Sequence, residues 1–361
     1  MVLSEVESAP ARGLALSATR RVVMSFAERG ARTSTKPHDP DYLLRPHVGE
    51  RRFGWTHYGV MIPDLPSPHR YLSVMIMAGM PGQSAFDVDE VVATSPRDTV
   101  TVSVSTAVAA QYKSLSMSRE CHLGADGDDL RFGSLVTISG RYPEFSVVID
   151  IPGLYTELRF AMADRATWFV QGLPYHHLSL LGDFTGVIRT DDSTLTVSGQ
   201  GNIEYARCVG PYALRDRLLP ATRKLPVDFF TYHVVSLPDD AQILFCRVGM
   251  LAERVGDLVQ HRTTTSAGDW RVNNVSTDRT FYEVLDYEEQ PRVDQGGHRM
   301  LLPRRFRFGV RDRLTVTGTY DTEPRYGVGR GYIWGYMADV DIDGRTIRTR
   351  GYSEYVNVRA T

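Results

Sequence analysis

The sequence predicts a mainly β protein built from two tandem antiparallel β-barrels, with one short helix near the N-terminus. From Gly54 onward, short runs alternate apolar and polar residues, as in TVTVSVST at 99–106 and FSVVIDI at 145–151. Asp- and Gly-rich pieces such as GADGDD and DIDGR separate these runs and supply turn geometry. Strong amphipathic helices are missing from this part of the chain, so we expect antiparallel sheet in sandwiches or barrels.

The composition is typical of a globular protein with a large core. The chain has 361 residues, of which 42% are hydrophobic and 23% are charged. This apolar content excludes a disordered chain, and the length excludes a small disulfide-stapled protein. A chain of this length is expected to form about two domains. The formal net charge is only −2, which argues against a dedicated nucleic-acid-binding protein.

The N-terminal part is expected to be an extension that contains the helix. Residues 1–13 are predicted to be disordered. Residues 14–30 place apolar side chains at roughly helical spacing, and Gly30 is expected to end the helix. We interpret this segment as a helix packed on the body of the protein. A helix lying on a membrane surface is the alternative.

Several features bear on the compartment. The N-terminus carries acidic residues where a signal peptide needs basic ones, and it lacks an apolar core. The most apolar stretch, Tyr71–Met80, is about half the length of a transmembrane span. The widely spaced Cys121, Cys208 and Cys246 predict reduced, buried thiols. We therefore expect a cytoplasmic protein without a transmembrane segment, with peripheral membrane contact left open.

The two halves of the chain resemble each other at an offset of about 150 positions. The order of the matching blocks predicts a duplication, with an N-terminal extension at 1–50, a first barrel at 51–215 and a second barrel at 216–361. Each half is large enough for a closed barrel that encloses one small ligand. The matching blocks are 55–60 with 230–235, 70–79 with 241–250, 157–165 with 305–313, and 190–205 with 340–355.

The sequence resembles the AttH / hydroxyneurosporene synthase group, double-barrel relatives of the lipocalins within the calycin superfamily. The resemblance covers about residues 50–361 and rests on the tandem halves, on GWTHYGVMIP, on PYHHLSLLGDFTG and on the terminal GYSEYVNV. More narrowly, the sequence resembles an actinobacterial branch of that group. The resemblance implies tandem lipocalin-like barrels and catalysis on bulky apolar molecules by a shaped cavity and a few acid residues, without an organic cofactor. It does not supply a catalytic motif residue by residue.

A Glu–Tyr pair ends a predicted strand in each half, Glu204–Tyr205 and Glu354–Tyr355. Because successive strand residues point to opposite faces, one member points into the barrel and the other outward or into the seam between domains. Burial in apolar surroundings raises the pKa of a Glu, which can then protonate an alkene or polarise a carbonyl. Both Glu residues are therefore candidate catalytic acids, and both Tyr residues are candidate ligand contacts. In the alternative, architectural reading, each Glu pairs with an Arg that is near in sequence, Arg207 or Arg350, and each Tyr closes a barrel end.

Two adjacent histidines, His176 and His177, lie on opposite faces of one predicted strand. Tyr175 and Ser179 share the face of His177 and form a polar line suited to a ligand-binding wall. A histidine in the lumen could act as a general acid or base near neutral pH. We predict that His177 is catalytic and that Tyr175 and His176 contact the ligand. The alternative is a histidine that hydrogen-bonds the backbone or caps the domain interface.

Further candidate contacts come from the first strand of each half and from the glycine-rich run GVGRGYIWGYMADV. That run lacks the Lys-Ser/Thr of a nucleotide-binding loop and is typical of a bulged strand whose aromatic residues line a cavity or pack between barrels. We predict no metal site, because nothing in the sequence fixes any histidine beside the further ligands that a metal needs. The further candidate contacts are His57, Tyr58, Tyr232, His233, Trp334 and Tyr336.

Three functions fit these residues. The first is a cofactor-independent hydratase, isomerase or cyclase that acts on a bulky hydrophobic metabolite, isoprenoid or polyketide-like, in a barrel or inter-barrel cavity. The alternative is a non-catalytic carrier of the same ligand class, and the third is a structural protein with filled barrels. A buried carboxyl without an ionic partner favours the first, an apolar lumen the second and a packed lumen the third. The expected partner is a small hydrophobic molecule and not a nucleic acid, and the oligomeric state is left open.

Overall fold

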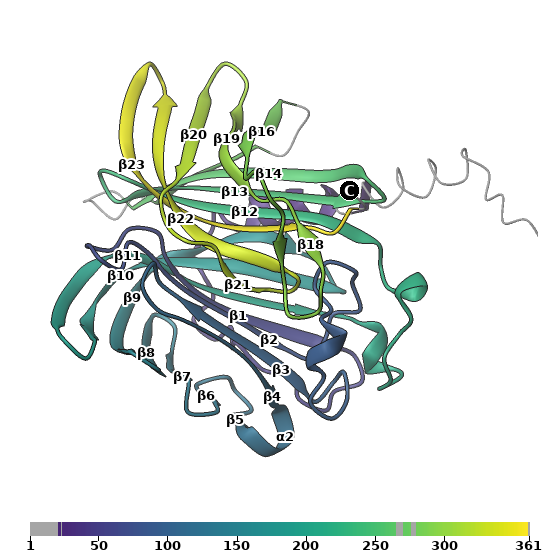
Figure 1. Ribbon diagram of the computed structural model, residues 1–361. Helices are drawn as coiled ribbons and strands as arrows, with labels where there is room; N and C mark the ends of the chain where they lie inside the picture. The colour runs from purple at the N-terminus through teal and green to yellow at the C-terminus, as the bar shows by residue number, and fades with distance from the viewer. Residues whose placement is uncertain (1–20, 23, 265–269, 276–278, 360–361) are drawn as a thin grey trace, which may run out of the picture.

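Two antiparallel β-sheets face each other across the middle of the molecule (Figure 1). The computed structural model describes residues 21–22, 24–264, 270–275 and 279–359. The first sheet has 11 strands and forms a nearly closed barrel, whereas the second has 10 strands and forms a half-barrel. The predicted mainly β fold, with two tandem barrels and a short N-terminal helix, is confirmed.

In the first sheet, each strand pairs with the next along the chain except at β4 and β5, and β1 also pairs with β11. The edge strands β4 and β5 are joined directly by the short helix α2 (Met117–Glu120), which brings the two ends of the sheet together. The strands are β1 (Trp55–Ile62), β2 (Leu72–Ala78), β3 (Thr99–Ser105), β4 (Ala110–Ser116), β5 (Cys121–Leu123), β6 (Asp129–Phe132), β7 (Val136–Arg141), β8 (Glu144–Ile151), β9 (Leu154–Gln171), β10 (Tyr175–Arg189) and β11 (Thr194–Cys208).

The interior of the first barrel is filled with side chains. Alternate residues of its strands, such as Val60, Leu180 and Ile203, form one continuous apolar cluster. The connector that follows the N-terminal helix adds Leu44 to this cluster. The Tyr58 hydroxyl donates a 2.8 Å hydrogen bond to the carbonyl oxygen of Leu44, which fixes the connector against the barrel. This filled interior leaves the outer faces of the strands as the place for a site.

The second sheet repeats the arrangement with a more open curve. A separate two-stranded ribbon, β17 (Arg292–Val293) with β18 (Arg299–Met300), lies beside it. The concave side carries stacked aromatic rings, among them Phe245, Phe306 and Phe308. The strands are β12 (Val227–Leu237), β13 (Ala241–Met250), β14 (Glu253–Thr264), β15 (Trp270–Val275), β16 (Thr280–Tyr287), β19 (Pro303–Val310), β20 (Leu314–Tyr320), β21 (Arg325–Val328), β22 (Gly331–Ile342) and β23 (Arg345–Asn357).

The predicted internal duplication is visible in the strand order. β1 lies between β2 and β11, and β12 lies in the same way between β13 and β23. The predicted match between 157–165 and 305–313 does not follow this correspondence. β9 is the third strand from β1, whereas β19 is the fourth from β12. The Arg/Phe alternation that suggested the match is common to half-exposed strands, so it does not specify which strand is which.

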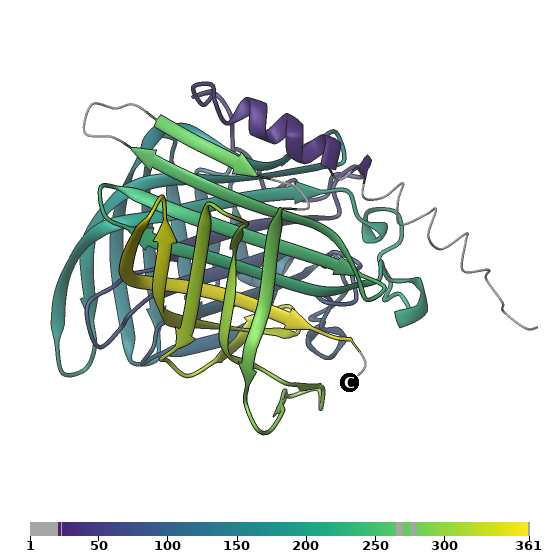
Figure 2. The same ribbon diagram turned by 90° about the horizontal axis from the view of Figure 1, so that it is seen from above.

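The N-terminal helix lies on the outside of the body, as expected (Figure 2). It occupies residues 21–22 and 24–33 of the described chain, and the expectations for residues 1–13 and 14–20 lie outside the described part. Gly30 does not end the helix. A Cβ at Gly30 would lie 2.8 Å from the carbonyl oxygen of Trp168, so the glycine allows close approach to β9.

The two sheets pack face to face through a third apolar cluster. The first sheet contributes residues such as Met61 and Phe169, and the second contributes Val234, Leu244 and Tyr352. Three short 3₁₀ turns lie in the connections around the sheets: η1 (Asp89–Val91), η2 (Pro211–Ala213) and η3 (Ala221–Arg223). The outer face of the first barrel thus becomes an interior surface of the whole molecule.

The cysteines and the membrane prediction can be placed in this fold. Cys121, Cys208 and Cys246 are unpaired and half-buried. Burial raises the pKa of all three thiols, which therefore stay protonated at neutral pH. Among the described residues, no helix has the length and apolar character needed to cross a membrane.

Candidate active site between the two sheets

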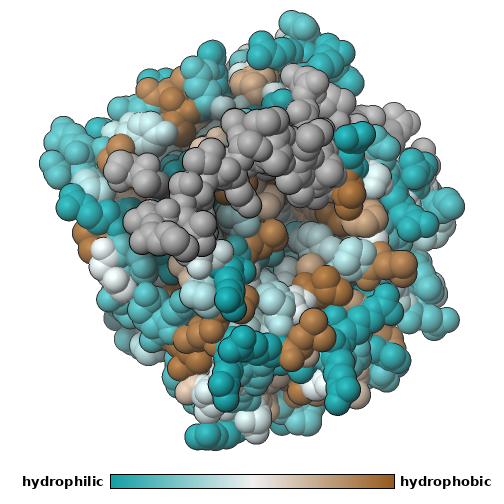
Figure 3. Space-filling view, turned by 90° about the vertical axis from the view of Figure 1, so that its right-hand side faces the viewer, coloured by the Kyte–Doolittle hydropathy of each residue, from teal (hydrophilic) through white to brown (hydrophobic). Residues whose placement is uncertain are grey.

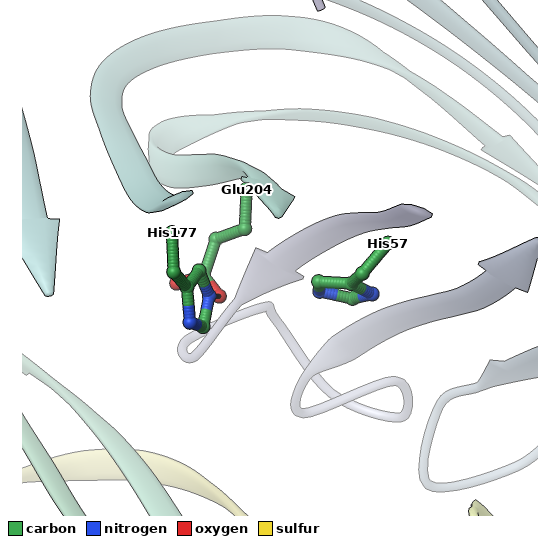
Figure 4. Close-up of side chains that lie close together, drawn as sticks. All are labelled: His57, His177 and Glu204. Carbon is green, nitrogen blue, oxygen red and sulfur yellow. Dashed lines mark ion pairs between the residues drawn. The ribbon is translucent and has the colours of Figure 1, made fainter. Parts of the chain in front are cut away.

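Three polar side chains of the first sheet meet on the face that is turned toward the second sheet. His57 lies on β1, His177 on β10 and Glu204 on β11 (Figure 4). The next residue, Tyr205, points the other way into the filled barrel, as strand alternation requires. One nitrogen or oxygen atom of each of the three side chains lies within 4.8 Å of those of the other two. The fold therefore brings together residues that are far apart in sequence.

The His57 ring has a fixed orientation. Its Nδ1 lies 3.0 Å from the carbonyl oxygen of Ile76. A carbonyl oxygen can only accept, so Nδ1 carries the proton and Nε2 keeps a free lone pair. Burial lowers the pKa of His57 to about 4, so the ring is neutral at pH 7. Gly59 leaves space for the ring, because a Cβ there would lie 3.0 Å from Nε2 of His57.

The Glu204 carboxylate is buried and is held from two sides. The Tyr232 hydroxyl of β12 donates a 2.5 Å hydrogen bond to Oε1, and Nε2 of His177 lies 3.6 Å from Oε2. Burial by itself raises the pKa of Glu204, but the contacts with His177 and Tyr232 outweigh burial and keep this pKa below its ordinary value. Glu204 is therefore ionised at neutral pH. The Tyr175 hydroxyl lies 3.0 Å from Nδ1 of His177 and orients that ring.

The second carboxyl, Glu354, lies on β23 of the facing sheet and is also buried. The Tyr352 hydroxyl donates a short hydrogen bond to its Oε1. Ser73 of β2 in turn donates a 3.2 Å hydrogen bond to the Tyr352 oxygen. Burial raises the pKa of Glu354 to about 8, and the negative charge of Glu204 adds to this increase. At neutral pH, Glu354 therefore carries a proton and Glu204 does not.

Arg262 of β14 is a buried cation between the sheets that was not among the predicted site residues. Its guanidinium donates hydrogen bonds to Oγ1 of Thr167 at 3.2 Å, to Oγ of Ser179 at 3.1 Å and to Oε1 of Gln242 at 2.9 Å. Burial lowers the pKa of Arg262 to about 10, and the group remains a cation that is attracted to Glu204. No local sequence signal marks it, because Arg262 sits in an alternating run that also fits an exposed strand.

A family model matches residues 75–361 of the chain, and its description is a family of unknown function, DUF6670. The chain belongs to this family. No curated protein matches the chain. The DUF6670 assignment therefore gives a family without giving an activity.

Solved structures show which fold this DUF6670 chain has. A protein from Nitrosomonas europaea assigned as AttH superposes with a TM-score of 0.60 at 12% identity, covering 90% of this chain and 99% of that one. Kievitone hydratase from Nectria haematococca superposes with a TM-score of 0.52 at 8% identity, covering 90% of this chain and 94% of that one. The fold implied by the AttH resemblance is thus confirmed. No comparison bears on the predicted actinobacterial branch.

Most of the remaining predicted site residues lie away from the inter-sheet face. Tyr58 and Tyr205 pack inside the first barrel, and His176 contacts Tyr42 through a 3.0 Å hydrogen bond from the Tyr42 hydroxyl to Nδ1. The concave side of the second sheet holds most of the others, and the rings around His233 form its aromatic core. The strand register puts His233, Trp334, Tyr336 and Tyr355 on that side, and Trp334 and Tyr355 also belong to the apolar cluster between the sheets.

The arginines that would neutralise the two Glu residues in the architectural reading are engaged elsewhere. Arg350 pairs with Asp321 at 2.7 Å. Arg207 lies 3.1 Å from Nε2 of His47 and stacks over the Phe53 ring. The geometry thus differs from the architectural reading, in which Arg207 or Arg350 would hold the carboxyls.

The site lies near one end of the sheets. His57 and His177 are each the third residue of their strands, and Glu354 is near the end of β23. Figure 3 shows this end of the molecule, where a hollow lies near the centre with apolar side chains beside it. Part of the His177 side chain is exposed, at 21%, in contrast to the buried Glu204. Of these two side chains, His177 is thus the one that reaches toward solvent. The pockets of about 210, 590 and 300 Å³ are lined by other residues and do not include this cluster.

Proposed function

We propose that the protein is a hydratase, isomerase or cyclase that acts between its two sheets on a bulky hydrophobic metabolite, of isoprenoid or polyketide type, without an organic cofactor. The observation that carries the proposal is the pair of buried carboxyls on facing sheets. Glu354 is protonated at neutral pH and Glu204 is ionised. In enzymes with two carboxyls in one site, the carboxyl whose environment keeps it protonated commonly acts as the acid. The carboxyl whose environment keeps it ionised commonly acts as the base.

Glu354 is the general acid in this proposal. It transfers its proton to one carbon of an alkene, whose π electron pair forms the new C–H bond, or to a carbonyl oxygen, whose lone pair forms the new O–H bond. The hydrogen bond from Tyr352 stabilises the carboxylate that remains after the transfer. The positive charge that develops on the substrate is stabilised by the ionised Glu204. In a hydration, water adds to the cation and releases its proton to the base on the other side of the site.

Glu204 and His177 form the base side of the site. Nε2 of His177 lies 3.6 Å from the carboxylate, and part of the His177 side chain is exposed, so a proton accepted there can pass out of the site. Tyr232 holds Oε1 and leaves Oε2 for proton transfer. His57 presents a lone pair to the same space.

The surroundings suit an apolar substrate. The cluster between the sheets includes Met61, Met75, Phe169 and Leu244, and none of these carries a charge. The interior of the first barrel is filled, which is the feature expected of a structural protein, so in this proposal the ligand binds between the sheets and not in that lumen. Kievitone hydratase has the same fold, so the fold can accommodate a hydratase.

The test starts from the molecule that the protein retains. Native mass spectrometry followed by organic extraction identifies the chemical class of the ligand, and purified protein is then incubated with that class and with a panel of isoprenoids and polyketides. We expect a product that differs from the substrate by one water or by isomerisation. E354Q is expected to lower turnover by about 10²-fold or more while it retains the ligand.

The matched control is E144Q, which removes an exposed carboxylate at the start of β8 and should leave turnover unchanged. Full turnover by E354Q would overturn the assignment of the acid. Retention of a ligand without turnover of any panel member by the wild type would instead favour a non-catalytic carrier.

A further inference from the structure

We propose that His57, His177 and Glu204 form a binding site for one divalent first-row transition-metal ion. The three side chains come from three adjacent strands and converge on the inter-sheet face (Figure 4). Two imidazoles and one carboxylate are a ligand set that Zn²⁺, Fe²⁺ and Co²⁺ accept. The sequence argued against a metal because nothing fixed His57 beside other ligands. The pairing of β1 and β10 with β11 supplies that constraint.

Each of the three side chains has an outer partner that turns its donor atom inward. Nδ1 of His57 donates to the Ile76 carbonyl, which leaves the Nε2 lone pair free. Nδ1 of His177 faces the Tyr175 hydroxyl, and its Nε2 is buried without a hydrogen-bond partner. Tyr232 occupies Oε1 of Glu204 and leaves Oε2 available. Metal-binding residues characteristically have their other polar atom held by a carbonyl, carboxylate or hydroxyl in this manner.

The distances permit coordination after small side-chain rotations. Bonds of about 2.0–2.2 Å to one ion place two donor atoms roughly 3.0–3.5 Å apart. Nε2 of His177 and Oε2 of Glu204 are already 3.6 Å apart, and all three donors lie within 4.8 Å of one another. Three protein ligands leave at least one coordination position for water or substrate, which is the arrangement of catalytic and not of structural metal sites.

The other nearby histidines do not join the set. His176 is adjacent to His177 on β10 but faces the opposite side, where it meets Tyr42. His233 lies on the concave side of the second sheet, with its Nε2 2.9 Å from the Thr231 hydroxyl. The site is therefore limited to one histidine from each of two strands and one carboxylate from the strand between them.

The experiment measures metal binding to the full-length protein after treatment with EDTA. Isothermal titration with Zn²⁺ should give one tight site per chain, and Co²⁺ should give a visible d–d spectrum characteristic of nitrogen and oxygen ligands. H57A, H177A and E204Q should each weaken binding by about 100-fold or more, and Y232F by about 10-fold. Circular dichroism of each variant verifies that it is folded, and the isosteric E204Q keeps the test valid if a histidine variant unfolds.

Two matched controls separate this site from other histidines. H176A alters the adjacent histidine on the opposite face and should bind Zn²⁺ as the wild type does. His298 lies 3.0 Å from Asp294 and 3.8 Å from Glu90, in a second group of a histidine and carboxylates. H298A removes the histidine of that group and should also leave the tight site intact. The proposal is overturned if the wild type binds Zn²⁺ no more tightly than E204Q, or if H298A abolishes binding.

The inference rests on the site of the proposed function, but metal binding is measured without substrate. An ion held by Oε2 of Glu204 and Nε2 of His177 takes up the two atoms of the base side, so the base role belongs to the metal-free protein and the ligand role to the metal-loaded protein. Loss of turnover in E354Q with unchanged Zn²⁺ affinity would support both proposals. A protein that turns over substrate after EDTA treatment and binds no Zn²⁺ would retain the acid–base function and lose the metal site.

Discussion

The hydroxyl of Tyr232 donates a 2.5 Å hydrogen bond to Oε1 of Glu204 across the boundary between the two sheets. Tyr232 belongs to β12 of the second sheet and Glu204 to β11 of the first. In its own sheet, Tyr232 lies opposite Glu354 in the register of β12 and β23. One tyrosine thus adjoins both carboxyls of the site and couples the packing of the sheets to the charge state of Glu204.

The Y232F variant should destabilise the whole protein. It leaves a buried, ionised carboxylate without one of its donors, which costs about 1–3 kcal/mol of the free energy of unfolding. Urea denaturation followed by circular dichroism measures this loss. Y155F removes a hydrogen bond of the same type, from Tyr155 to Glu157, on an exposed strand surface and should change stability by less than about 0.5 kcal/mol. Equal effects of the two variants would contradict a special role for the inter-sheet bond.

Glu354 should make stability fall as the pH rises. Burial raises its pKa from 4.5 to about 8 in the folded protein, so the folded state binds a proton that the unfolded state has released. The stabilisation is complete below pH 4.5 and is lost as the pH rises through about 8, with a slope of up to about 1.4 kcal/mol per pH unit. The titratable groups that act on Glu354 are Tyr352 and Glu204, and Tyr232 and Cys246 respond to its charge.

Denaturation of the wild type and of E354Q between pH 4.5 and 9 measures this dependence. The glutamine does not titrate, so E354Q should gain stability relative to the wild type across that range. E144Q, at an exposed position, should follow the wild type. Parallel curves for the wild type and E354Q would show that Glu354 does not hold its proton.

Replacing Gly30 by alanine should loosen the N-terminal helix, although this change usually stabilises a helix interior by up to about 1 kcal/mol. The new Cβ would lie 2.8 Å from the backbone oxygen of Trp168 and 3.3 Å from the backbone of Phe169, which cannot move aside as a side chain can. We expect a loss of about 1–3 kcal/mol and faster proteolysis of the helix. E28A, at an exposed position of the same helix, is the control, and a G30A protein as stable as E28A would contradict this packing.

The sequence by itself determined the strands and their alternation. The period of two already separated Glu204 from Tyr205 and His177 from His176, and the repeated blocks indicated two similar halves. It also identified His57, His177, Glu204 and Glu354 as candidates. The strands and the two similar halves could be predicted because they depend on local pattern, and a strand has only two faces. The catalytic and binding roles of the four candidates stay predictions.

Only the tertiary structure decided which face of each strand carries the site. Alternation is unchanged if inside and outside are exchanged, so a pattern cannot distinguish the lumen from the seam between sheets. The packing of the second sheet on the outer face of the first turned Glu204 into a buried group and assigned Tyr205 to the barrel core. The convergence of His57 with Glu204, and the approach of Arg262 from β14, arise from pairings between distant segments that no local spacing encodes.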